Sequence, residues 1–131
     1  FQIVDDLLDY TSTEADLGKP VLDDLRNGLL NAPVLLALES DRLSKQDKAE
    51  LKKAIEALFT NNTNTPAVDT DESEIISVIR GFLDQADAIE QTRRLARQYA
   101  EEAIQSVDFI APGEAKNAMT ALVEAAIYRQ S

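Results

Sequence analysis

Residues 1–10, FQIVDDLLDY, place three aspartates among apolar side chains with no basic residue between them. On a helix, which turns by about 100° per residue, the polar side chains of this stretch fall on one narrow stripe. The stripe consists of Gln2, Asp5, Asp6 and Asp9. Because the rest of this helix is apolar, we expect it to be buried among other helices, with the stripe facing a cavity.

The aspartates of this stripe indicate a cation site. Carboxylates in a cavity are costly unless they are paired, and bound cations are the obvious compensation. Asp5 and Asp9 lie one helical turn apart and can hold one hard cation or a pair. We expect Mg²⁺, because it uses few carboxylates, keeps several waters and takes its remaining ligands from substrate phosphates. The alternative is a solvated acidic helix face, although such faces usually mix Lys with Glu, as residues 45–53 do.

The segment LGKP at residues 17–20 could add a positive charge to such a site. Lys19 stands between a glycine and a proline, and a lysine held there can act as a point charge on a diphosphate. Taken alone, the segment also fits an ordinary turn. We expect the nearby Arg26 to pair with Asp23 or Asp24 rather than with a ligand.

The rest of the chain is predicted to be helical, with a polar loop, TNNTNTPAVDTDES, over residues 60–73. Apolar residues recur at helical spacing, and no alternating strand pattern competes with them, so the predicted fold class is all-α. The expected helices cover residues 1–10, 25–39, 44–59, 73–83, 86–107 and 112–126. At the helix ends and breaks we expect a kink or break at Pro33, a cap at Ser44 and a capping box of Asp71 and Glu74. We expect Pro112 in the first turn of the last helix.

The amino-acid composition excludes several classes of function. Lys and Arg total 13 against 24 Asp and Glu, a net charge of −11 that argues against a nucleic-acid partner. The chain has no Cys and no His, so it offers neither disulfides nor thiolate or imidazole chemistry. It lacks an apolar run of about 18 residues and the flanks of a signal peptide. We therefore expect a cytoplasmic protein without stable membrane insertion.

The start of the chain lies inside a helical pattern. Phe1 follows no Met and no capping residue, whereas helices normally open on Ser, Thr, Asp or Asn. We expect Phe1 to lie in the middle of a helix of a longer parent.

Residues 1–38, FQIVDDLLDYTSTEADLGKPVLDDLRNGLLNAPVLLAL, resemble the second aspartate-rich region of the trans-isoprenyl diphosphate synthases, the family of farnesyl, geranylgeranyl and longer polyprenyl diphosphate synthases. The F-Q pair, the DDxxD motif, G-K-P, D-L, G and A-P occur in the family's order and spacing. The segment ARQYAEEAIQSV and the final helix are similar to the family's C-terminal helices more loosely. The resemblance implies that residues 1–131 are the C-terminal portion of a single polyprenyl synthase domain, with the N-terminal portion absent, in an isoprenoid synthase helical bundle.

The resemblance also implies a reaction. Two DDxxD motifs on facing helices hold Mg²⁺ against the diphosphate of an allylic substrate, whose ionisation gives an allylic cation. The double bond of isopentenyl diphosphate attacks this cation, and loss of a proton completes the extension. The metal ions stabilise the charge of the departing diphosphate. On this mapping Asp5 is the first metal ligand and Asp9 the second.

The same mapping assigns roles to neighbouring side chains. It implies that Asp6 orients metal-bound water and that Lys19 grips the leaving diphosphate. It further implies that Phe1 and Gln2 face the reacting prenyl groups.

The chain departs from the family pattern in two ways. Many members carry Lys directly after the glycine and Thr two places before the proline, where this chain has Leu29 and Asn31. A second diphosphate contact is then missing unless Arg26 compensates. The first DDxxD motif and the basic residues that bind isopentenyl diphosphate are also absent from these 131 residues. We therefore predict that the chain alone makes no prenyl chains. The resemblance further implies that the parent is a homodimer or, alternatively, a heterodimer.

Other interpretations stay open. A class I terpene cyclase shares the helical cavity and the metal chemistry, but its second motif differs from the series Asp5, Asp9 and Thr13. A noncatalytic subunit of a heteromeric synthase would keep the fold without the active site, although the intact DDLLD argues against it. An acidic helical interaction module would leave the site unused. The wording of residues 18–28 weakly favours a bacterial medium- or long-chain enzyme over a farnesyl or geranylgeranyl one.

Overall fold

The computed structural model describes residues 1–12, 22–62 and 71–128 of the chain. Within these ranges every regular element is an α-helix, which confirms the predicted all-α class. The helices are α1 (Gln2–Thr11), α3 (Asp23–Arg26), α4 (Ala32–Glu39), α5 (Lys45–Asn62), α6 (Glu72–Gln85), α7 (Ala88–Ser106) and α8 (Glu114–Tyr128). None of these described helices combines the length and the apolar character needed to cross a membrane.

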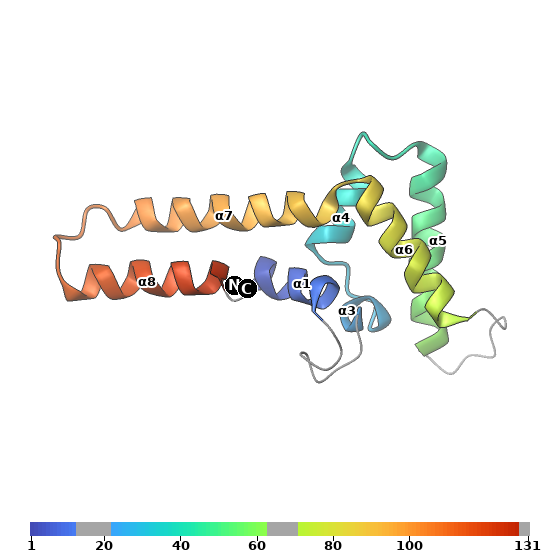
Figure 1. Cartoon of the computed structure of the whole chain (residues 1–131), viewed down its shortest axis with the longest axis horizontal. Helices are drawn as coiled ribbons and strands as arrows, with labels where there is room; N and C mark the ends of the chain where they lie inside the picture. Colours follow the sequence, from blue (N-terminus) through green and yellow to red (C-terminus); the bar gives the residue numbers. More distant parts are fainter. Residues whose placement is uncertain (13–21, 63–70, 129–131) are drawn as a thin grey trace.

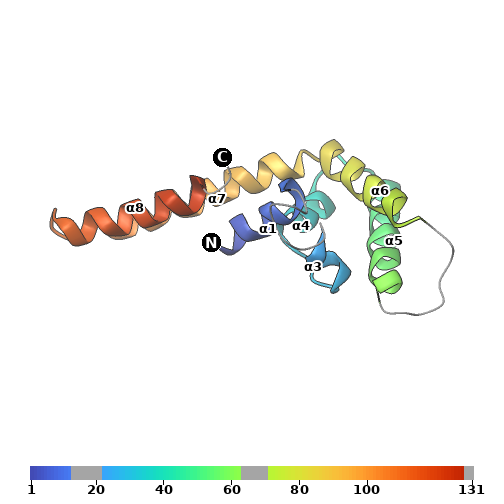
Figure 2. The same ribbon diagram turned by 60° about the horizontal axis from the view of Figure 1, so that its bottom comes forward.

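The long helix α7 organises the molecule (Figure 1). Helix α8 runs back along one half of α7, and α1 lies along the other half, so that α1 and α8 follow one another beneath it. Helices α5 and α6 form a hairpin at the end remote from α8, and α3 and α4 lie between this hairpin and α1. The turned view keeps α8 and the α5–α6 hairpin at opposite ends, so the molecule is elongated (Figure 2).

The hydrophobic core lies where α3, α4, α5 and α6 meet. Its fully buried large side chains include Leu25 of α3, Val34 of α4, Leu51 and Leu58 of α5, and Ile79 of α6. Full burial of one such side chain is worth about 1.5–3 kcal/mol. Helix α1 packs against α3 and α4, which this core holds in place.

The predicted cap at Ser44 is confirmed. Asp71 also caps its helix, but through Ser73, while the N–H of Glu74 bonds to the Asp71 carbonyl; the reciprocal bond of the predicted Asp71–Glu74 capping box stays a prediction. Ser44 Oγ accepts a hydrogen bond from the N–H of Asp47 at 3.1 Å, and Asp47 Oδ2 accepts one from the N–H of Ser44 at 2.9 Å. These bonds from Ser44 hold the pKa of the Asp47 carboxyl below its usual range. Asp71 Oδ1 accepts from the N–H of Ser73 at 3.0 Å, and this bond likewise lowers the pKa of Asp71. Both signals act within one turn, which is why the sequence alone reveals them.

The predicted continuous helix over residues 25–39 is wrong, because α3 already ends at Arg26. The N–H groups of Gly28 and Leu29 bond back to carbonyls of α3 at 3.0 and 2.8 Å, in the pattern of a Schellman turn. Gly28 has a φ of +77°, which L side chains rarely adopt, and a Cβ there would lie 3.1 Å from the ring of Phe59. The break thus comes from a glycine that closes the helix.

Three other expectations need correction. Pro33 neither kinks nor breaks a helix, because it lies in the first turn of α4, where its missing N–H has no helical partner to lose. The predicted loop over residues 60–73 begins later, since α5 continues to Asn62, and residues 63–70 lie outside the described part of the chain. Pro112 precedes the last helix, which begins at Glu114, instead of lying in its first turn.

Candidate functional site

The polar stripe of α1 divides into exposed and buried side chains. Gln2 and Asp5 are exposed, whereas only 8% of Asp6 and 1% of Asp9 is accessible to solvent. Buried carboxylates require hydrogen-bond partners. The stripe therefore has a solvent-exposed part and a buried part. The hydrogen-bond partners of Asp6 and Asp9 show the structural role of the buried part.

Asp9 closes the N-terminus of α3. Its Oδ1 accepts a hydrogen bond from the N–H of Asp23 and its Oδ2 one from the N–H of Asp24, each at 3.3 Å. These N–H groups belong to the first turn and have no partner within the helix. A carboxylate at this place also matches the positive end of the helix dipole. Asp9 thereby ties α1 to α3.

Asp6 does the same for α4. Its Oδ2 accepts from the N–H of Ala32 at 3.0 Å, and its Oδ1 accepts from Gln2 Nε2 at 2.8 Å. Asn31, the residue that precedes α4, makes no capping bond with its own side chain. The cap of α4 is therefore supplied by α1 across the molecule.

A third connection runs through Tyr10, which follows Asp9 in the chain. Its hydroxyl donates to Asn31 Oδ1, and Asn31 Nδ2 donates to Asp24 Oδ2 at 3.2 Å. Burial raises the pKa of Tyr10 far above its ordinary value of 10.0, and the negative charge of Asp9 raises it further. Tyr10 therefore keeps its proton and remains a hydrogen-bond donor.

Asp5 and Asp9 offer at most part of the ligand set of a magnesium ion, and their role as ligands stays a prediction. In the described ranges, no three or more Asp, Glu, His or Cys side chains gather closely enough to form a complete metal site. Exposed Asp5 lies one turn before Asp9 on α1, and a carboxylate oxygen has more than one acceptor position. This donor set suits Mg²⁺, which accepts one or two carboxylates and completes its shell with water and phosphate. It does not suit a metal that needs a cage of protein ligands.

The other predicted site residues fall in different places. Lys19 lies outside the described residues. Phe1 is 66% exposed and borders a small apolar groove together with Tyr99 of α7 and Val123 of α8. Gln2 donates the hydrogen bond to Asp6 within α1 that is described above. The contacts of Phe1 and Gln2 with prenyl groups stay a prediction.

Arg26 links the site to α6. Its guanidinium forms an ion pair with Glu72 in the first turn of α6, and 15% of the Arg26 side chain is exposed. The pairing with Asp23 or Asp24 that the sequence predicts stays a prediction, and the ion pair with Glu72 joins two helices. Only the packing of α3 against the α5–α6 hairpin brings these two side chains together.

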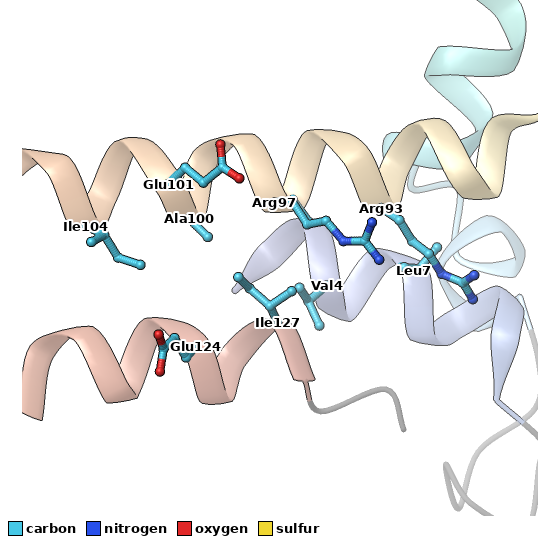
Figure 3. A pocket seen from close by; sticks show the side chains of 10 residues that line it. Val4, Leu7, Arg93, Arg97, Ala100, Glu101, Ile104, Glu124 and Ile127 are labelled. Atoms are coloured by element: carbon cyan, nitrogen blue, oxygen red, sulfur yellow. The ribbon is translucent and has the colours of Figure 1, made fainter.

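Sequence reasoning missed a groove between α1, α7 and α8. The groove has a volume of about 580 Å³, and Arg93 and Arg97 point from α7 toward α1 inside it (Figure 3). Val4 and Leu7 of α1 form part of its wall, on a different face of α1 from the aspartates. The spacing of the two arginines by four residues is the signal that could have indicated it. Glu101 of α7 and Glu124 of α8 lie farther along the groove, so the groove carries both signs of charge (Figure 3).

Comparison with known proteins identifies relatives of the whole chain. One is "Prenyl transferase" of Cyanophora paradoxa, 35% identical over 129 residues, or 98% of this chain and 34% of the relative. Another is "Solanesyl-diphosphate synthase 1, mitochondrial" of Oryza sativa subsp. japonica, 30% identical over 92% of this chain and 24% of the relative. A third is "Heptaprenyl diphosphate synthase component 2" of Bacillus subtilis, 33% identical over 95% of this chain and 31% of the relative. The chain thus spans 24% to 34% of the lengths of these relatives.

The family described as polyprenyl synthetase matches residues 1–70. This range includes α1, α3, α4 and α5, and with them Asp6, Asp9, Asp24 and Asn31, whose side chains join α1, α3 and α4. The match covers more than half of the 131 residues. The chain belongs to the polyprenyl synthetase family.

Proposed function

We propose that this chain supplies the second aspartate-rich half of the active site in a magnesium-dependent polyprenyl diphosphate synthase. The reaction joins an allylic diphosphate to isopentenyl diphosphate and gives a longer polyprenyl diphosphate. One observation carries the proposal: α1 exposes Asp5, while Asp6 and Asp9 are fixed by backbone N–H groups of two other helices. An exposed carboxylate on a helix held in this way is preorganised for a cation.

In this proposal Mg²⁺, when bound, neutralises the charge that develops on the departing diphosphate. Asp5 binds the cation directly and Asp9 supports it one turn later. Asp6 keeps α1 at a fixed distance from α4, and Gln2 restrains the Asp6 carboxylate. Lys19 grips the diphosphate as a point charge. No side chain of the chain acts as an acid or base, which agrees with a sequence without His or Cys.

The complete reaction belongs to a longer protein in this proposal. The chain is the C-terminal portion of a single synthase domain, makes no prenyl chains alone, and forms a homodimer or a heterodimer within its parent. The words "component 2" in the name of the Bacillus relative support the heterodimer as the alternative. A cytoplasmic location stays a prediction, because the names of the Oryza relative and of a Yarrowia lipolytica relative contain the word "mitochondrial".

A condensation assay with labelled isopentenyl diphosphate tests the proposal. The chain alone is expected to show no turnover with both diphosphates and Mg²⁺, whereas the longer parent turns over and loses activity in the Asp5→Ala variant. Turnover by the purified chain that disappears in Asp5→Ala would contradict the predicted inactivity of the chain. A parent whose activity is indifferent to Asp5→Ala would contradict the role of this site and favour a noncatalytic subunit.

A further inference from the structure

Asn31 occupies the centre of the junction between α1, α3 and α4. Its side chain is buried, with 5% of the residue exposed, and it leaves the N-terminus of its own helix uncapped. Asp6 of α1 performs that capping through the N–H of Ala32. The Asn31 amide is therefore available to connect two other helices, Tyr10 of α1 and Asp24 of α3.

These contacts close a ring. Asp9 and Tyr10 are neighbours in the chain, the Tyr10 hydroxyl donates to Asn31 Oδ1, and Asn31 Nδ2 donates to the Asp24 carboxylate. The N–H of Asp24 then returns to Asp9 Oδ2. The ring thus connects the side chain of Asn31 to the carboxylate of Asp9 by two routes, one through each neighbour.

The chemistry of the ring requires an amide at its centre. A side-chain amide offers an acceptor at one end and donors at the other, and here the acceptor faces a hydroxyl and the donor faces a carboxylate. An aspartate in the place of Asn31 would set a second carboxylate against Asp24. An alanine would leave the buried hydroxyl of Tyr10 and the half-buried carboxylate of Asp24 without these partners.

We infer that Asn31 is a positioning residue for the cation site: by joining Tyr10 to Asp24 it holds α3 on the Asp9 carboxylate and sets the direction in which Asp9 can meet a cation. This inference rests on the proposed function, because the cation is the Mg²⁺ of that site. Asn31 itself touches no ligand in this account. Its substitution should therefore alter the geometry of Asp9 first and the affinity for Mg²⁺ with a diphosphate second.

The first readout is amide hydrogen exchange of the chain, measured by NMR at the N–H groups of Asp23 and Asp24 without any metal. In Asn31→Ala these two amides are expected to exchange roughly tenfold faster, because α3 is released from Asp9. The control Ile79→Val, in the core of α6, should leave their exchange within about twofold of the unsubstituted chain. Unchanged exchange in Asn31→Ala would overturn the inference.

The second readout is calorimetric binding of inorganic pyrophosphate in the presence of Mg²⁺. Asn31→Ala is expected to bind about tenfold more weakly and Ile79→Val about as well as the unsubstituted chain. Faster exchange with unchanged affinity in Asn31→Ala would overturn the positioning role and leave the proposed function standing. Absence of binding to the unsubstituted chain would overturn the proposed function itself, and the inference with it.

Tyr10→Phe provides a milder variant in case Asn31→Ala does not fold. It removes only the hydroxyl and so breaks one bond of the ring with little change in volume. A smaller change in both readouts, of about threefold, supports the inference. No change in either readout would overturn it.

Discussion

The α1–α3–α4 junction buries polar side chains, whereas the α7–α8 hairpin exposes apolar ones. The junction buries four polar side chains: Asp6, Asp9, Tyr10 and Asn31. The hairpin exposes four large apolar side chains: Tyr99, Phe109, Met119 and Leu122. In the junction, carboxylates of α1 accept hydrogen bonds from N–H groups at the N-termini of α3 and α4, which have no partner within their own helices. In the hairpin, these large apolar side chains keep much of their surface exposed to solvent.

Because of this difference in burial, chemically identical substitutions should have unequal effects on stability in the two regions. A buried polar group that loses its partner costs the free energy of its desolvation, while an exposed group keeps water as a partner. An exposed apolar side chain also has little burial to lose. Matched pairs of variants, one in each region, therefore test this difference in stability better than single substitutions.

The largest expected contrast is between two leucines. Leu25→Ala, at the fully buried side chain of α3, should lower the free energy of unfolding by about 3 kcal/mol, because it leaves a cavity in the core. Leu122→Ala, at a residue of α8 that is 59% exposed, should change it by less than about 0.5 kcal/mol. Urea denaturation followed by circular dichroism measures both. Equal losses would break the comparison between the regions.

Two aspartates give the next contrast. Asp9→Ala should cost about 2 kcal/mol, because it leaves two N–H groups of α3 without their acceptor. Asp108→Ala removes an ion pair with Lys116 at 3.1 Å, in which Asp108 is 67% exposed, and should cost less than about 0.5 kcal/mol. The same denaturation experiment compares them. An Asp9→Ala variant as stable as Asp108→Ala would show that Asp9 does not hold α3.

A smaller contrast is expected between two tyrosines. Tyr10→Phe should destabilise the chain by about 1 kcal/mol, since the buried Asn31 loses a hydrogen-bond donor. Tyr99→Phe, at a side chain that is 56% exposed, should have almost no effect. Thermal unfolding of the two variants in parallel sharpens the comparison, and a Tyr99→Phe variant that is the less stable of the two would contradict it.

The pH dependence of the free energy of unfolding reports on the Tyr10 hydroxyl. Burial, then the charge of Asp9 and, to a smaller degree, of Asp24 and Asp6, raise the pKa of Tyr10 above its ordinary 10.0 in the folded state. Above pH 10 the unfolded chain releases this proton while the folded chain keeps it. The free energy of unfolding should therefore fall as pH rises, by up to about 1.4 kcal/mol per pH unit.

Urea midpoints between pH 8 and about 11 measure this decline. Tyr10→Phe is the control, because it lacks the group that titrates and should lose this part of the slope. An identical slope in both proteins would show that Tyr10 does not keep its proton on folding.

The sequence predicted well those features that arise within a few residues. The all-α class follows from helical spacing, and the caps at Ser44 and Asp71 are formed within one turn. The end of α3 was missed even though Gly28 is the residue type that closes helices, because apolar residues on both sides of it continue the helical pattern. A terminating glycine should have outweighed that continuity.

The candidate site could be predicted only in part for a different physical reason. Spacing along α1 places Asp5 and Asp9 on one stripe, but it cannot tell which of them will cap another helix. The N–H of Ala32 on Asp6 depends on how α4 packs against α1. The ion pair of Arg26 with Glu72 depends in the same way on the packing of α6. Such partners are set by tertiary structure and leave no signal in local sequence.

The proposed function requires the aspartates of α1 to divide their work: Asp5 binds the cation directly, while Asp9 mainly holds α3 and only supports the cation. The most direct test is a calorimetric titration of Mg²⁺ and inorganic pyrophosphate into the Asp5→Asn variant, beside its urea denaturation curve. We expect affinity to fall by tenfold or more, about 1.4 kcal/mol, while the free energy of unfolding changes by less than about 0.5 kcal/mol. Unchanged affinity, or a loss of stability as large as that of Asp9→Ala, would contradict the division.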